Sequence, residues 1–83
     1  MKIREILTQT AEKISHRWPE TPFLDSQVLM QEAAGMTKEK LLAAYNTDIQ
    51  DDVLMVFSRM TEMRLSGFPV AYITGKKEFF SRI

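Results

Sequence analysis

The chain consists of stretches in which apolar residues recur every three or four positions, separated by short polar breaks, and this pattern predicts amphipathic helices. The first predicted helix covers residues 2–17. Its inward stripe consists of Ile3, Ile6, Leu7, Thr10, Ile14 and Trp18. Pro19 ends this helix, because the residue before a proline avoids the α-helical conformation.

A second helix is predicted to begin at Thr21 and Pro22, since threonine is a good N-cap and proline suits the first helical position. The apolar residues of this helix cover several of its sides. They are Leu24, Val28, Leu29, Met30, Ala33 and Ala34. Such a helix usually lies at the centre of a bundle. Gly35 can adopt the left-handed conformation that ends it.

Two further helices follow. Thr37 is the expected cap of a short third helix, whose inward residues are predicted to be Leu41, Leu42 and Tyr45. A fourth helix is predicted over residues 50–66, with acidic residues at its start that suit the helix dipole. Its expected buried stripe consists of Val53, Val56, Phe57, Met60 and Met63.

The fourth helix runs into a segment rich in turn residues. Gly67 is predicted to be the left-handed residue of a Schellman ending, with Phe68 folding back on Met63. Pro69 then opens one more helical turn, and Gly75 ends it.

After Gly75 the pattern changes, and the apolar Phe79, Phe80 and Ile83 among polar neighbours predict the start of a strand. A single strand lacks a pairing partner in a helical domain. We therefore expect an all-α fold, a small bundle of four to five helices over residues 1–75. Residues 76–83 would begin a truncated β-hairpin that links to an absent catalytic domain.

The composition restricts the class of protein. The 83 residues suggest one small domain, and 11 basic residues balance 11 acidic ones, which makes direct nucleic-acid binding unfavourable. There is no cysteine, which excludes disulfides and a cysteine-based zinc site. No apolar run approaches the roughly 20 residues of a membrane span. The absence of cysteine fits a reducing compartment, and we expect a cytoplasmic protein and a monomer.

The residue types needed for catalysis are scarce. His16 is the single histidine, and its place near the end of the first helix favours a surface residue over a metal ligand or general base. Ser15 adjoins it, but neighbours on a helix point in different directions. The three glycines are isolated and form no phosphate-binding loop. No catalytic, cofactor-binding or metal-binding residue is predicted.

Three segments carry a family resemblance. Residues 64–79 read RLSGFPVAYITGKKEF, which resembles the pattern R-x-x-G-x-P-x-A-Y-I-x-G-x-x-E-F of the HemK family. Residues 24–29 are similar to that family's L-D-A segment, with Ser26 where alanine is usual, and residues 35–42 resemble its short third helix. The residues that match the family motifs are Asp25, Arg64, Gly67, Pro69, Tyr72, Gly75, Glu78 and Phe79.

The resemblance implies a function. Full-length members of the family transfer a methyl group from S-adenosylmethionine to the glutamine of the Gly-Gly-Gln motif in class-1 peptide-chain release factors. Their catalytic domain carries an Asn-Pro-Pro-Tyr motif, and this chain has no Asn-Pro dipeptide. The chain is thus expected to be an N-terminal substrate-recognition domain that docks and orients the release factor beside the enzyme's own methyltransferase domain. It would be inactive alone and bind no cofactor itself.

The sequence leaves some roles open. Arg64 is expected to have an internal role, because paired charges hold helix ends in register: it would bond the last carbonyls of its own helix or pair with Asp25 inside the bundle. The alternative is a contact with an acidic patch on the release factor. Tyr72 is predicted to lie in the core. The exposure of four apolar residues is undecided: Met36, Met55, Phe79 and Phe80.

Two rival functions remain. One is a freestanding helical adaptor that binds a peptide in a groove lined by methionine and phenylalanine. The other is a small helical domain that binds nucleic acid.

Overall fold

The structure, a computed structural model, describes residues 1–75. Within these residues five helices follow one another: α1 (Ile3–Ser15), α2 (Pro22–Ala34), α3 (Lys38–Ala43), α4 (Asp51–Leu65) and α5 (Val70–Thr74). The predicted all-α bundle of four to five helices is confirmed. The predicted hairpin start at 76–83 lies outside the described residues. Within residues 1–75, no helix is long and apolar enough to cross a membrane.

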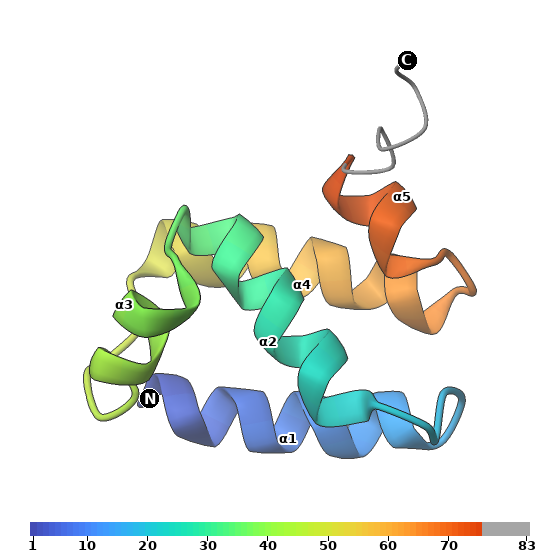
Figure 1. The fold of residues 1–83 in the computed structure, drawn as a ribbon, viewed down its shortest axis with the longest axis horizontal. Coiled ribbons are helices and arrows are strands. Elements are labelled where there is room, and N and C mark those ends of the chain that lie inside the picture. Colours follow the sequence, from blue (N-terminus) through green and yellow to red (C-terminus); the bar gives the residue numbers. More distant parts are fainter. Residues whose placement is uncertain (76–83) are drawn as a thin grey trace.

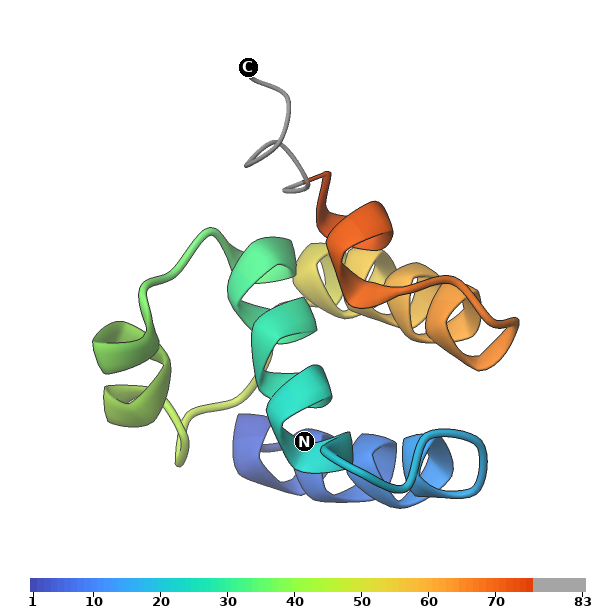
Figure 2. The same ribbon diagram turned by 45° about the vertical axis from the view of Figure 1, so that its right-hand side comes forward.

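Helix α2 is the central element, as its apolar pattern predicted. It crosses between α1 and α4 and packs more extensively on each of them than they pack on each other (Figures 1 and 2). Helix α3 lies at one end of the bundle, and α5 lies beside the C-terminal half of α4 (Figure 1). The end of α1, the start of α2 and the end of α4 are thereby brought together.

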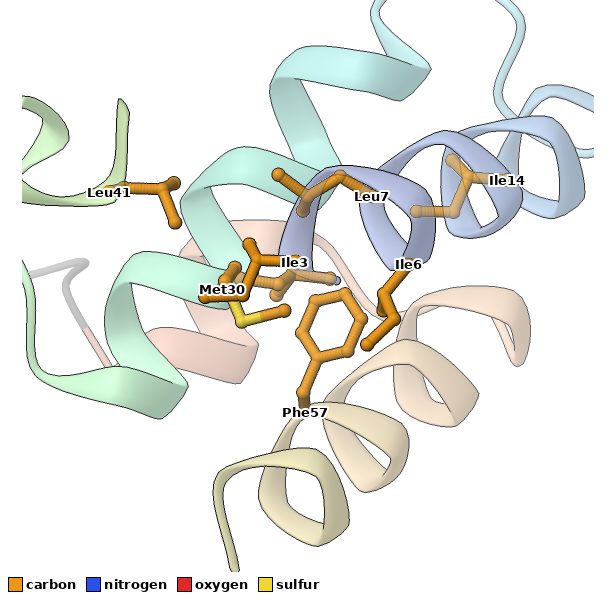
Figure 3. Close-up of a cluster of buried hydrophobic side chains, with 8 residues drawn as sticks. Ile3, Ile6, Leu7, Ile14, Met30, Leu41 and Phe57 are labelled. Atoms are coloured by element: carbon orange, nitrogen blue, oxygen red, sulfur yellow. The ribbon is translucent and has the colours of Figure 1, made fainter. Parts of the chain in front are cut away.

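The core is a cluster of buried side chains from the first four helices. Its members are Ile3, Ile6, Leu7, Ile14, Leu29, Met30, Leu41 and Phe57. Phe57 projects from α4 toward Ile6 of α1 and Met30 of α2 (Figure 3). Each large side chain buried in this way contributes about 1.5–3 kcal/mol to stability before entropic costs.

Two expected core positions in α3 and α4 are exposed. Leu42 is 48% exposed and Val56 is 44% exposed, so both predictions are wrong. Helix α3 has only six residues, and it places Leu41 alone in the buried core. Val56 precedes the buried Phe57, and successive residues of a helix point about 100° apart, which turns Val56 away from α2.

The methionines divide between core and surface. Met30 is fully buried, and Met60 is partly buried against the core, as predicted. Met36, left open by the sequence, also packs against the core. Met55 lies on the surface with 62% of its area exposed.

The helix caps agree with the sequence in part. Gly35 has a positive φ of 66° at the end of α2, and the Thr37 hydroxyl accepts a hydrogen bond of 3.2 Å from the Lys40 amide, as predicted. The N-cap prediction for Thr21 is correct in position, but its side chain makes no capping bond. The Thr21 hydroxyl donates instead to Asp25 Oδ1 at 3.4 Å.

The N-terminus pairs with the loop before α4, which the sequence did not predict. The Ile3 amide donates to the Thr47 carbonyl at 3.0 Å, and the Ile49 amide donates to the Met1 carbonyl at 3.1 Å. Helix α1 therefore begins at Ile3, after a short extended contact that joins it to the α3–α4 loop.

Candidate functional site

Two motif residues from distant parts of the sequence form an ion pair. Asp25 lies in the first turn of α2 and Arg64 in the last turn of α4. Arg64 Nη2 lies 2.8 Å and Nε 3.2 Å from the same oxygen, Asp25 Oδ2. The two side chains are 12% and 11% exposed, so water screens the pair only weakly. The internal pairing that the sequence favoured for Arg64 is present.

Trp18 covers the guanidinium group. The Arg64 Cζ atom lies 4.1 Å from the centroid of the Trp18 ring, which is the geometry of a cation–π contact. The indole Nε1–H donates to the Arg64 backbone carbonyl at 2.8 Å. Sequence reasoning placed Trp18 in the apolar stripe of the first helix and missed this role. Its only signal was that a half-buried indole needs an acceptor for its N–H group.

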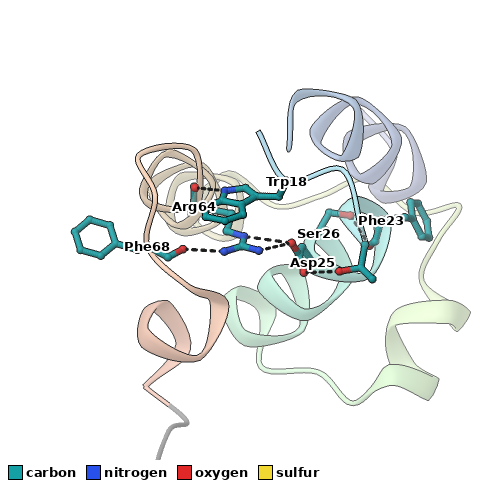
Figure 4. A network of polar contacts seen from close by, with 7 residues as sticks. Trp18, Phe23, Asp25, Ser26, Arg64 and Phe68 are labelled. Atoms are coloured by element: carbon teal, nitrogen blue, oxygen red, sulfur yellow. Dashed lines mark hydrogen bonds and ion pairs between the residues drawn. The ribbon is translucent and has the colours of Figure 1, made fainter. Parts of the chain in front are cut away.

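The third nitrogen of the guanidinium group binds the turn that follows α4. Arg64 Nη1 donates to the Phe68 carbonyl at 3.1 Å. Figure 4 shows the three directions together, with Asp25 on one side, the Phe68 carbonyl on another and Trp18 over the group. We call these four residues, Trp18, Asp25, Arg64 and Phe68, the Arg64 junction. It joins the α1–α2 loop, the start of α2, the end of α4 and the turn into α5.

Gly67 ends α4 in the predicted Schellman motif. The Phe68 amide donates to the Met63 carbonyl and the Gly67 amide to the Arg64 carbonyl, both at 3.1 Å. The φ of Gly67 is 113°, and a Cβ atom there would lie 3.0 Å from Arg17 Nη2. Glycine is therefore required by the backbone conformation and favoured by the close side chain.

The stretch after Gly67 forms α5 with the predicted ends. Pro69 is its N-cap residue, and Gly75 closes it with a φ of 74°. The prediction that Tyr72 lies in the core is wrong, because its side chain is 50% exposed. Val70 and Ile73 occupy the face that packs on the core, which leaves Tyr72 on the outer face. There its ring stacks on Phe68, with centroids 5.2 Å apart.

The last two motif residues, Glu78 and Phe79, lie outside the described residues, as does Phe80. The expectation that they stand at the junction with another domain stays a prediction.

Residues 1–75 offer little for acid–base or metal chemistry. His16 is exposed at the C-cap of α1, the surface position that was expected. Within these residues, no three histidine, aspartate or glutamate side chains gather into a possible metal site. A hollow of about 380 Å³ between α1 and α4 is lined by Lys13 and Glu62 among others, and it lies apart from the Arg64 junction. The contacts of the junction hold the helix ends together.

The comparisons with known proteins cover the same part of the chain as the described helices. The model of the PrmC N-terminal domain family matches residues 5–75. The chain belongs to this family. All five helices except the first two residues of α1 lie inside the matched region, and so does the whole Arg64 junction.

Several relatives of this PrmC N-terminal domain are methyltransferases by name. The release factor glutamine methyltransferase of Haemophilus influenzae is 35% identical over 82 residues, which cover 98% of this chain and 28% of that protein. A bifunctional methyltransferase of Rickettsia typhi is 34% identical over 96% of this chain and 15% of its own length. The release factor glutamine methyltransferase of Bacillus subtilis is 40% identical over 69% of this chain and 20% of its own.

The chain thus spans less than a third of the length of these relatives. No solved structure matches it.

Proposed function

We propose that the chain is the substrate-recognition domain of a protein glutamine N5-methyltransferase that uses S-adenosylmethionine. The substrate is a class-1 peptide-chain release factor, and the methylated residue is the glutamine of its Gly-Gly-Gln motif. The domain docks the release factor and orients it against the enzyme's methyltransferase domain. Such a protein works in the cytoplasm, where translation ends.

The observation that carries this proposal is the family match over residues 5–75, together with the relatives' names. The Haemophilus influenzae relative, a release factor glutamine methyltransferase, aligns with 98% of the chain. The alignment uses only 28% of that relative, so most of the relative lies outside it. A division of labour between a recognition domain and a catalytic domain accounts for both fractions.

The described residues fit the recognition half of that division. Each of Gly35, Gly67 and Gly75 ends a helix with a positive φ, so none belongs to a glycine-rich loop between a strand and a helix. We assign the cofactor and the methyl transfer to the remainder of the full-length enzyme. The chain by itself is expected to be inactive.

The proposed boundary of the domain is residue 75. Helix α5 is closed by Gly75, and the family match ends at the same residue. Residues 76–83 are then the start of the link to the methyltransferase domain.

A binding titration tests the proposal. The 83-residue chain is titrated into a labelled class-1 release factor, and methylation kinetics are measured for the full-length enzyme with and without residues 1–75. We expect saturable binding by the chain, and deletion should raise KM for the release factor by at least about tenfold, a loss of about 1.4 kcal/mol. A free Gly-Gly-Gln peptide, too small to reach a docking domain, serves as the control substrate, and its KM should not change.

The docking role is wrong if the chain does not bind the release factor and the deletion leaves KM unchanged. Binding of the chain to the release factor without any effect of the deletion would instead favour the freestanding adaptor.

A further inference from the structure

Helix α5 is too short to hold its own position. It has five residues, none of them fully buried, and its N-cap residue makes no side-chain capping bond. Isolated helices shorter than roughly 12 residues are marginal in water. The orientation of α5 must therefore come from contacts with the rest of the bundle. Val70 and Ile73 supply apolar packing against the core, and the turn that leads into α5 adds a polar contact.

The turn between α4 and α5 has one polar tie to a side chain of the bundle. Among the hydrogen bonds of residues 1–75, the bond from Arg64 Nη1 to the Phe68 carbonyl is the one that joins a side chain of α4 to residues 67–69. Phe68 directly precedes Pro69, whose carbonyl accepts the Tyr72 and Ile73 amides of α5. The Phe68 peptide is thus the last unit before α5, and its direction sets the direction of the helix.

The guanidinium that holds this peptide is itself fixed. Two of its nitrogens bind Asp25 Oδ2 on α2, at 2.8 and 3.2 Å, and the Trp18 ring lies 4.1 Å from Cζ. A planar group bound at one edge and covered on a face can offer its third nitrogen in only one direction. The relative position of α2 and α4 therefore determines where the guanidinium group holds the Phe68 carbonyl.

We infer that Arg64 is a positioning residue that sets the orientation of α5 against α2 and α4. It couples the interhelical ion pair with Asp25 to the turn at Phe68. A lysine cannot do this, because its ammonium group is a point charge without a fixed fork and cannot bind Asp25 and Phe68 in fixed relative directions.

The inference gains its functional meaning from the proposed function. Helix α5 is the last described element, and the family match ends with it at residue 75. If the chain is the recognition domain of a larger enzyme, α5 sets the direction in which the polypeptide leaves that domain. Arg64 would then fix how a docked release factor faces the catalytic domain, without touching either one.

The test needs neither partner nor activity, so its result is independent of the proposed function. Amide residual dipolar couplings and hydrogen exchange are measured by NMR on the 83-residue chain with Arg64→Lys. Arg59→Lys is the matched control, since Arg59 is an exposed arginine on the same helix. We expect the Arg64→Lys couplings of α5 to no longer fit the same alignment tensor as α2 and α4. Hydrogen exchange of the Tyr72 and Ile73 amides should accelerate by about tenfold, whereas the amides of Leu29 and Phe57 should stay protected.

Two results overturn the inference. One is an unchanged α5 orientation and exchange rate in Arg64→Lys. The other is an equal acceleration at α5 and at Leu29 and Phe57, which would make Arg64 a general stabiliser. Asp25→Asn provides a second variant that keeps the side-chain shape, and it should disturb α5 in the same direction, because Asp25 holds the guanidinium in place.

Discussion

Substitution of Asp25 by alanine leaves the buried guanidinium group of Arg64 without its counter-charge. Arg64 is 12% exposed at its side chain, and Asp25 provides the carboxylate that balances it. In Asp25→Ala the guanidinium keeps its bond to the Phe68 carbonyl but loses both contacts to Oδ2. The side chain must then either remain buried without a counter-charge or leave its place under Trp18.

The cost follows from the burial of the pair. Removal of one partner of a buried ion pair typically destabilises a protein by about 3–5 kcal/mol. Because each side chain keeps about a tenth of its area in water, we expect the lower end, about 3 kcal/mol. A domain of this size has a total stability of roughly 4–12 kcal/mol. The variant should therefore fold, but with a much smaller free energy of unfolding.

Urea unfolding measures this change. The chain has one tryptophan, Trp18, which lies on the Arg64 guanidinium, so its fluorescence reports the junction, and circular dichroism at 222 nm reports the helices. With a slope of about 1–1.5 kcal/mol per molar urea, the midpoint should fall by about 2–3 M. Glu12→Ala is the control, since it removes an exposed carboxylate from α1 and should change stability by less than about 0.5 kcal/mol.

A double variant separates pairing from packing. The double variant Asp25→Ala with Arg64→Met has no unpaired buried charge at this site. Its loss in free energy of unfolding should therefore be smaller than the sum of the losses of the two single variants, by at least about 1 kcal/mol. If Asp25→Ala costs no more than Glu12→Ala, or if the two losses simply add, the ion pair does not stabilise the bundle and the reasoning from its burial is wrong.

Three further changes test other parts of the fold by the same urea assay. Gly67→Ala should cost about 1–3 kcal/mol, because a φ of 113° strains any side chain and the new Cβ meets Arg17, and a cost below that of Gly75→Ala would contradict this. Thr37→Ala should cost about 1 kcal/mol, because it removes the cap on α3. Thr21→Ala removes no cap bond and should cost less. A larger loss of stability in Thr21→Ala than in Thr37→Ala would contradict the assigned caps. Phe57→Ala should cost about 3–5 kcal/mol and Met55→Ala less than about 0.5, and similar losses would mean that the core is misassigned.

The helices could be predicted from the sequence because local signals and apolar spacing agree. Gly35, Thr37, Gly67 and Gly75 all end or begin helices where their backbone preferences require, and these effects act within a few residues. The central place of α2 followed from its apolar residues on several sides. What lay beyond the sequence was the set of pairings between distant segments, such as the contact of Met1 and Ile3 with the loop at Thr47.

The wrong predictions share a physical cause. Tyr72 and Leu42 lie on short helices, where only one face reaches the core and the apolar pattern is too brief to show which. Val56 lies on a long helix but beside the narrow face that meets α2. In each case the side chain is apolar or aromatic, so the sequence favours burial, and the position of neighbouring helices decides against it.

The Arg64 junction gives a physical reason for two of the three sequence segments that carried the family resemblance. They are 39 positions apart at Asp25 and Arg64, and the structure makes them the two halves of one contact. The Gly67 turn and the Phe68 carbonyl extend that contact to α5, which accounts for the glycine and proline that follow the arginine in the motif. The described residues of this motif therefore specify how three helix ends meet. On that argument the described residues contribute geometry to the proposed enzyme, and the direction of α5 is the quantity that they control.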